Sequence, residues 1–156
     1  MSNAEMFEGL KMGAVLYGGL YKNVVMEMGA AKALAMHGRQ CEVMGAMMAE
    51  GMRAQLSGRD LTPHALADAV GVLESSMGLS PVIEETPTGV IARNTACPFY
   101  EGYKAAGLDL AAIKTMCEAA EAAEQPAVQK VLPQVSVRLE FRKTPDEPCV
   151  EIYELK

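Results

Sequence analysis

The stretch A-C-P-F-Y at residues 96–100 is the part of the sequence around which the chain is organised. Proline is favoured at the first position of a helix, and the residue before a proline takes an extended conformation. Cys97 is therefore predicted to cap a helix that begins at Pro98 and ends near Ala106. Free backbone N–H groups at a helix start lower the pKa of a thiol, and the thiolate is both a nucleophile and a metal ligand. We interpret Cys97 as a functional thiol, because Ser or Asp would be a better cap.

A strand pattern comes directly before this stretch. Residues 81–85 and 90–94 flank the turn sequence T-P-T-G at residues 86–89, and this arrangement predicts a hairpin.

The clearest strand signal lies at the end of the chain. Apolar and polar residues alternate over residues 135–142, and a loop then leads to a second strand at residues 149–155. In the second strand we expect Val150 and Ile152 to face inward, with Cys149, Glu151 and Tyr153 on the opposite face.

Helical patterns fill the first half of the chain. Residues 5–21 show a helical face rich in glycine, so either another helix packs closely there or the helix breaks near Gly18. A longer helix is predicted over residues 30–56, and another begins after Thr62 and ends near Met77.

These elements predict an α+β fold in one domain, residues 5–156, because 156 residues that are 50% hydrophobic suffice for one core. A helical half, residues 5–78, packs on a small antiparallel sheet built from two hairpins in residues 80–156. Residues 1–4 are typical of an expression scar, although Met1 also allows a native start.

Composition excludes several classes of protein. The net charge of −6 offers no basic face for phosphate backbones, so we expect no nucleic-acid partner. No apolar run reaches the ~20 residues that a membrane helix needs, and no signal peptide pattern is present. We therefore expect a cytoplasmic protein whose four cysteines are thiols, metal ligands or packed core rather than a disulfide framework.

Methionines follow one face of the predicted helix at residues 30–56, and twelve are present in the chain. A stripe that includes Met44 and Met48 is commonly just core, but flexible thioethers also adapt to apolar ligands. The candidate ligand-binding residues are Met44, Met48, Tyr100, Arg138, Glu151 and Tyr153.

Cysteines and histidines could also hold a metal. His37 and Cys41 lie one helical turn apart, which suits a shared metal as well as a packed histidine beside a buried thiol. Cys117 falls within a predicted helix that begins near Leu108 and is broken at Pro126. The candidate ligands for zinc or another divalent metal are Cys97, Cys117, Cys149 and His37, although no C-x-x-C motif is present.

Residues 97–100, Gly107, Cys117 and residues 148–152 resemble the family of L-2-amino-thiazoline-4-carboxylic acid hydrolases. The part from Cys117 onward is equally similar to the 4-vinyl reductase domain, a small-molecule-binding module. Both families carry Gly-Asp before the last cysteine, where this chain has Asp-Glu-Pro. The resemblance implies an α+β domain with helices packed on an antiparallel sheet, and a homodimer.

Two hypotheses of function follow. In the first, which the hydrolase resemblance implies, the protein opens a small ring at a C–N bond with a Cys97 thiolate or with metal-activated water. Cys149 and Glu118 would then assist Cys97, and the chain offers no evident general base beside it. In the second, the domain is not catalytic and binds an apolar small molecule or a metal. A purely structural oligomerisation unit is a third interpretation.

Overall fold

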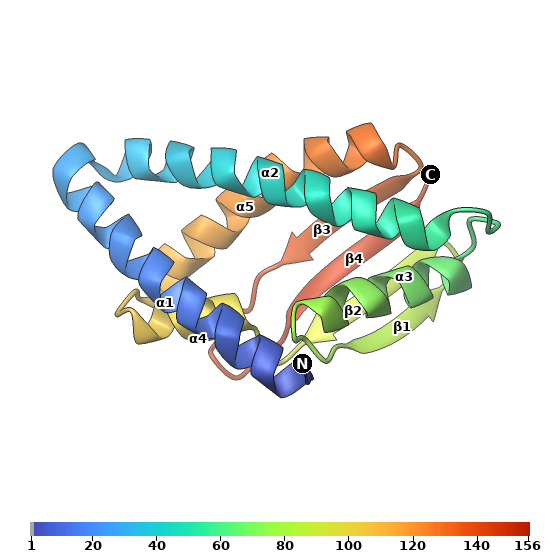
Figure 1. Ribbon diagram of the computed structural model, residues 1–156, viewed down its shortest axis with the longest axis horizontal. Coiled ribbons are helices and arrows are strands. Elements are labelled where there is room, and N and C mark those ends of the chain that lie inside the picture. The colour runs from blue at the N-terminus through green and yellow to red at the C-terminus, as the bar shows by residue number, and fades with distance from the viewer. Residues whose placement is uncertain (1) are drawn as a thin grey trace.

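A computed structural model of the chain describes residues 2–156 and shows an α+β arrangement of helices and strands (Figure 1). The predicted fold class and both predicted hairpins are confirmed, and the two hairpins form one four-stranded sheet. The elements, in chain order, are α1 (Asn3–Met28), α2 (Ala30–Leu56), α3 (Pro63–Ser76), β1 (Val82–Thr86), β2 (Gly89–Asn94), α4 (Pro98–Ala105), α5 (Leu110–Val131), β3 (Val135–Glu140) and β4 (Cys149–Leu155).

The sheet has the strand order β1-β2-β4-β3, and all neighbouring strands are antiparallel. β4 lies inside the sheet and pairs on both sides, so that Tyr153 is opposite Val90 of β2 and Val137 of β3. Side chains at directly opposed positions of antiparallel strands share a face of the sheet. The register therefore places Tyr153 and both valines on one face.

Helices cover this face of the sheet (Figure 1). α3 packs on β1 and β2, α5 packs on β3, and α2 packs on both α5 and α3. Leu66 and Val70 of α3 are buried in the same core cluster as Tyr153, which is only 2% exposed. The helices thus lie over the face that carries Cys149, Glu151 and Tyr153.

The expectation that Val150 and Ile152 face inward is therefore wrong. Both residues lie on the uncovered face of the sheet and are half-buried there, opposite Glu140 and Arg138 of β3. The reason is that β4 carries apolar side chains on both faces, so its own pattern does not decide which face the helices cover.

α1 is one continuous helix through Gly18. A Cβ at Gly18 would lie 2.9 Å from the Cβ of Ala106, just after α4, and 3.2 Å from a methyl carbon of Leu108. Close packing, rather than a helix break, is the alternative that the structure confirms. α1 ends where Gly29, with φ of 85°, turns the chain into α2, and this turn is the apex of the V that α1 and α2 form in Figure 1.

Residues 2–4 are part of the fold, because Ser2 is the N-cap residue of α1 and the helix begins at Asn3. The Ser2 hydroxyl accepts from the Glu5 N–H at 3.3 Å, and the Glu5 carboxylate accepts from the Ser2 N–H at 2.7 Å. This capping box fixes the start of α1. Met1 lies outside the described residues.

The predicted helix break at Pro126 is also wrong, because α5 runs through this residue. A proline inside a helix costs a backbone hydrogen bond. The turn that follows is held by tertiary packing, since Val128 and Leu132 are both buried.

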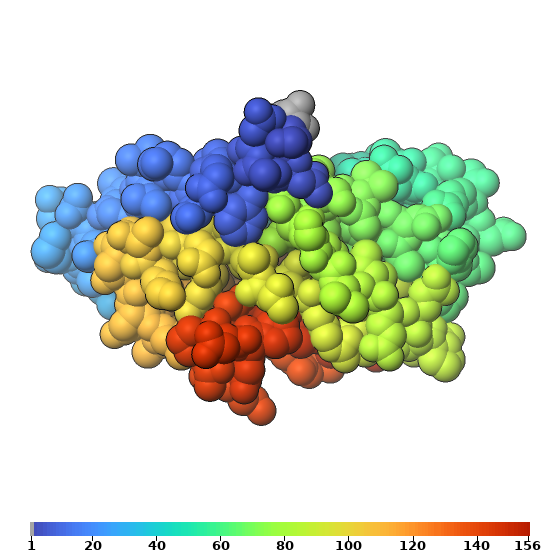
Figure 2. All heavy atoms as spheres, turned by 90° about the horizontal axis from the view of Figure 1, so that it is seen from below, coloured from blue at the N-terminus to red at the C-terminus, as the bar shows by residue number. Residues whose placement is uncertain are grey.

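α1 and α2 also expose apolar side chains to solvent. Those on α1 include Met12, Leu16 and Leu20, and those on α2 include Met36, Val43 and Met47. Within residues 2–156, no helix combines the length and the apolar character that crossing a membrane requires. In Figure 2 the start of α1, in dark blue, lies at the upper edge of the view and the red C-terminal part of the chain lies at the lower edge, with the yellow segment around α4 between them.

The packing of α2 against α5 predicts opposite effects for two glycines on one helix. A Cβ at Gly45 would lie 2.8 Å from the backbone Cα of Glu124, whereas a Cβ at Gly51 meets nothing within 4 Å. Gly45→Ala should destabilise the protein by about 1–3 kcal/mol through overpacking. Gly51→Ala should stabilise it by up to about 1 kcal/mol through helix propensity.

Urea unfolding of the two variants beside the wild type measures both changes. Equal effects of the two substitutions would contradict this helix packing.

Candidate functional site

A cavity of about 490 Å³ lies between the helices and the covered face of the sheet. All five helices of the described chain contribute to its wall, together with β2, β3 and β4. Its volume falls within the range of ~300–1,000 Å³ that is usual for small-molecule sites. The wall is mainly apolar and includes four methionines, Met44, Met48, Met52 and Met77.

All four cysteines line this cavity. Cys41 lies on α2, Cys97 precedes α4, Cys117 lies on α5, and Cys149 begins β4. No disulfide joins any of them. The fold therefore brings together thiols that are far apart in the sequence, as a cysteine-lined site requires.

Burial holds the thiols of Cys41, Cys97 and Cys117 in their protonated form. Burial raises the pKa of Cys97 to about 11, although the nearby N–H groups of Tyr100 and Phe99 act in the opposite direction. Burial likewise raises the pKa of Cys41 to about 12, and it also raises the pKa of Cys117. Cys97 is the N-cap residue of α4, as predicted, but its side chain makes no capping hydrogen bond. The expected lowering of its pKa is wrong, because desolvation of the thiolate outweighs the helix start.

His37 is a buried histidine whose two ring nitrogens are both engaged. Nε2 lies 3.0 Å from the carbonyl oxygen of Met116, so Nε2 carries the hydrogen and donates it. Nδ1 then accepts from the Tyr17 hydroxyl at 3.0 Å. Burial lowers the pKa of His37, which favours this neutral form. His37 is therefore not placed to act as a general base for Cys97.

The cavity does not present a preformed metal site. Within residues 2–156, no three His, Cys, Asp or Glu side chains are grouped so that they could hold a metal ion. Cys97, Cys117, Cys149 and His37 all line the cavity, but both nitrogens of His37 already have partners. The predicted zinc site stays a prediction, and the donor set as arranged does not fit it.

Carboxyl groups also gather at the cavity. Glu121 and Glu124 of α5 and Glu151 of β4 are lining residues. The Tyr153 hydroxyl donates to Glu151 at 2.6 Å, and the Leu139 N–H donates to Glu121 at 2.8 Å. Burial, with Glu151 and Glu121 nearby, raises the pKa of Glu124 to about 7. The apolar cavity thus contains a local acidic wall.

Glu74 of α3 extends this acidic group beneath the cavity wall. It is fully buried and accepts from the side-chain amide of Asn94, a lining residue, at 3.2 Å. Burial and the neighbouring Glu151 raise the pKa of Glu74 to about 9, so Glu74 is protonated at neutral pH. Glu74 Oε1 and Asn94 Oδ1 have no hydrogen-bond partner within the described chain.

Arg142 is a buried cation close to the same end of the cavity, but its donors are already used. Its guanidinium lies 4.1 Å from the centre of the Tyr100 ring. Nε donates to the Cys149 sulfur at 3.4 Å, and the two terminal nitrogens donate to backbone carbonyls of Asn94, Thr95 and Pro145. Arg142 therefore ties the β3–β4 loop to the end of β2 and does not line the cavity.

The structure brings together some of the predicted site residues and separates others. Met44, Met48, Glu151 and Tyr153 line the cavity together with the cysteines and His37. Three predicted site residues, Tyr100, Arg138 and Glu118, do not line the cavity.

Tyr100 is buried against Arg142. Arg138 lies on the uncovered face of the sheet, because it is opposite Ile152, and pairs with Glu140. Glu118 is 53% exposed and forms a surface ion pair with Lys114.

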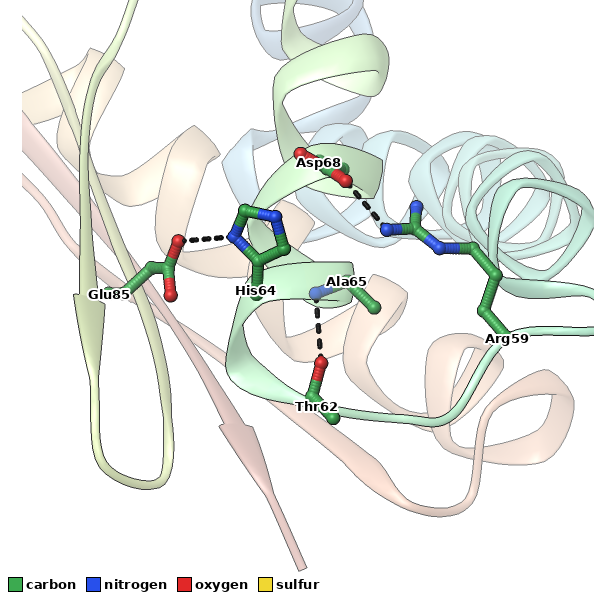
Figure 3. Close-up of polar contacts among 6 residues, drawn as sticks. All are labelled: Arg59, Thr62, His64, Ala65, Asp68 and Glu85. Carbon is green, nitrogen blue, oxygen red and sulfur yellow. Dashed lines mark hydrogen bonds and ion pairs between the residues drawn. The ribbon is translucent and has the colours of Figure 1, made fainter.

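His64 also lies on the surface of the protein (Figure 3). It lies in the first turn of α3, where Thr62 caps the helix through the Ala65 N–H, and Arg59 pairs with Asp68 beside it. The His64 ring lies 2.8 Å from a Glu85 oxygen of β1, and this hydrogen bond raises the pKa of His64. His64 is not among the residues that line the cavity, so the fold does not bring it to the cysteines.

Sequence reasoning named Glu151 but missed the other carboxyl groups of the site, although their spacing carries a signal. Glu121 and Glu124 follow Cys117 by four and seven residues and so share one helical face with it. Glu74 follows Val70 by four residues on the apolar face of α3, where a carboxyl group is unusual. Asn94 carries no such signal, because its burial depends on the sheet register.

The acidic group predicts how stability changes with pH. In the unfolded chain Glu74 ionises at its ordinary pKa of 4.5, whereas the folded protein keeps the proton up to about pH 9. From about pH 7 to about pH 8 the folded state therefore binds more protons than the unfolded chain, and the free energy of unfolding should fall by about 1 kcal/mol. Glu74→Gln should remove most of this slope and stabilise the protein at pH 8.

Urea unfolding at both pH values measures the slope, with the exposed Glu118→Gln as the matched control. A wild-type protein whose stability is flat between pH 7 and pH 8 would contradict the raised pKa of Glu74.

Comparisons of the chain with protein-family models, with curated proteins and with solved structures find no match. The resemblance to the thiazoline-carboxylate hydrolases and to the 4-vinyl reductase domain therefore stays a prediction. What this chain does has to be argued from the cavity itself.

Proposed function

We propose that this protein is a binding domain for an apolar small molecule, which it holds in the cavity between the helices and the sheet. The observation that carries the proposal is the cavity of about 490 Å³ with its methionine-rich wall. Methionine side chains are flexible and polarisable, so such a wall adapts to the shape of an apolar ligand. Apolar pockets with a few polar groups are the usual form of small-molecule sites.

The state of the thiols supports binding over thiol catalysis. A nucleophilic cysteine needs a lowered pKa or an adjacent base. Burial raises the pKa of Cys97 to about 11, and both nitrogens of His37 are engaged elsewhere. The thiols then act as small, weakly polar parts of an apolar wall.

A hydrolase that opens a small ring at a C–N bond is the second candidate. One observation favours it: Cys97 lies at the start of α4 and lines the same cavity as Cys149 and Glu151. A substrate that carried its own proton acceptor could take the Cys97 proton as the sulfur bonds to the ring carbon. Glu151 could pass that proton to the nitrogen as the C–N bond breaks, and water would then release the thiol. This candidate requires that Cys97→Ser abolish turnover while leaving the melting temperature nearly unchanged.

A neutral apolar dye tests the binding proposal directly. N-phenyl-1-naphthylamine should bind one molecule per chain, with a rise in fluorescence as it leaves water. Met48→Glu should weaken its binding at least tenfold, because a carboxylate would be buried in the methionine wall. Cys97→Ser should leave dye binding within about twofold of the wild type.

The matched control is Met26→Glu, which changes an exposed methionine of α1 outside the cavity. Equal loss of binding in Met26→Glu and Met48→Glu would place the dye on the surface and contradict the proposal. So would a wild-type protein that does not bind the dye.

We also propose that the protein forms a homodimer in the cytoplasm and has no nucleic-acid partner. The exposed apolar side chains of α1 and α2 support self-association, since large apolar surface patches usually mark interfaces. The four cysteines, none of them in a disulfide, support a reducing compartment. The net charge of −6 argues against phosphate backbones as partners.

Leu16→Glu tests the dimer, because Leu16 is exposed in the middle of α1. The variant should have half the mass of the wild type in light scattering coupled to size-exclusion chromatography. Val72→Glu, at an exposed residue of α3 that belongs to neither α1 nor α2, should keep the wild-type mass. A wild-type protein that is monomeric at micromolar concentration would contradict the dimer.

A further inference from the structure

The acidic wall of the cavity has an excess of hydrogen-bond acceptors. Glu121, Glu124 and Glu151 line it, and Asn94 brings a side-chain carbonyl. Asn94 is only 3% exposed, and its Oδ1 has no partner within residues 2–156. Buried polar atoms are normally hydrogen-bonded, so this unpartnered acceptor on the cavity wall points to a donor supplied by a ligand.

Most donors of the protein at this wall are already committed, and the proton of the buried Glu74 carboxyl lies beside Glu151. The Tyr153 hydroxyl donates to Glu151, and the Asn94 amide donates to Glu74. The Leu139 N–H donates to Glu121, and the Gln125 amide donates to the backbone carbonyl of Val137. A ligand that meets the remaining acceptors must therefore bring N–H or O–H groups of its own.

The charge balance makes the preferred donor a cation. No lysine or arginine is present among the residues that line the cavity. Arg142 is a buried cation beside Cys149, and its nitrogens already donate hydrogen bonds to the Cys149 sulfur and to backbone carbonyls. His37 is neutral, with both nitrogens engaged. Carboxyl groups in an apolar site without a cationic partner favour a ligand that carries positive charge.

The methionine wall lies next to this acidic wall. Gly45 of α2 leaves space into which Glu124 packs, because a Cβ at Gly45 would lie 2.8 Å from the Cβ of Glu124. Met44 and Met48 flank Gly45 on α2 and line the same cavity. The carboxyl groups and the apolar wall can therefore contact one ligand at its two ends.

We propose that the cavity selects lipophilic amines, with the ammonium group bound by Glu124, Glu151 and the side-chain carbonyl of Asn94 and the hydrocarbon part packed on the methionines of α2. This inference rests on the proposed function, because it needs an apolar cavity, and it adds the class of head group. The three N–H donors of a primary ammonium match these acceptors, and the charge pairs with the carboxylates.

Three octyl compounds with the same hydrocarbon tail and different head groups test the inference: octylamine, octanol and octanoate. Isothermal titration calorimetry at pH 7.5 and physiological salt should show octylamine binding at least tenfold more tightly than octanol. Octanoate should bind more weakly than octanol, because its carboxylate would be placed among carboxyl groups. The salt concentration suppresses unspecific attraction of the amine to an acidic protein.

Two variants locate the amine. Glu124→Gln and Glu151→Gln should each weaken octylamine binding about tenfold and leave octanol binding within about twofold. Gln at position 151 still offers an acceptor to Tyr153, and Glu124→Gln leaves that hydrogen bond untouched. Glu118→Gln is the matched control, since it removes an exposed carboxylate from the same helix. Unchanged octanol binding shows that each variant is folded.

Equal affinities for octylamine and octanol would overturn the inference and leave the apolar binding site standing. A preference for octylamine that survives both glutamate variants would also overturn it. If no octyl compound binds, the inference fails, and dye binding separately decides whether the proposed function fails with it.

Discussion

The pairing of β4 with both β2 and β3 is the constraint on which the site depends. Because β4 lies inside the sheet, its register is fixed from both sides, and Cys149, Glu151 and Tyr153 all point to the face that the helices cover. A one-residue shift would exchange this set for Val150 and Ile152 and give an ordinary apolar face. The observed register instead buries a thiol and a carboxyl group, so the core around them must be partly polar.

The helices do not pack against the whole of this polar face, and a cavity remains between them and the sheet. Leu66 and Val70 of α3 are buried in the same core cluster as Tyr153. The cavity between the helices and the sheet has thioethers, thiols and carboxyl groups in its wall. Burial keeps the Cys97 and Cys117 thiols and the Glu74 carboxyl protonated, which reduces the charge that the domain has to bury without a partner. A ligand with an apolar body and a donor-rich end would complete both parts of this wall.

Much of the fold could be predicted from the sequence because local signals agree there. Thr62 before Pro63, and the alternation over residues 135–142, fix element types through capping and periodicity. The failures come from tertiary effects: Pro126 stays helical because Val128 and Leu132 are packed, and the inward face of β4 depends on where the helices lie. The sequence left open whether the cysteines converge, because that depends on how the helices pack on the sheet. The pKa of Cys97 differed from expectation, because desolvation cannot be read from a capping position.

A crystal structure of the protein with bound N-phenyl-1-naphthylamine tests the central claim most directly, because it shows where an apolar molecule lies. The account predicts the dye between α2 and the sheet, in contact with Met48 and Tyr153, with the order of strands and the position of α5 unchanged. A dye bound on the outer face of α1 and α2, with α2 packed down onto an empty sheet face, would contradict the account.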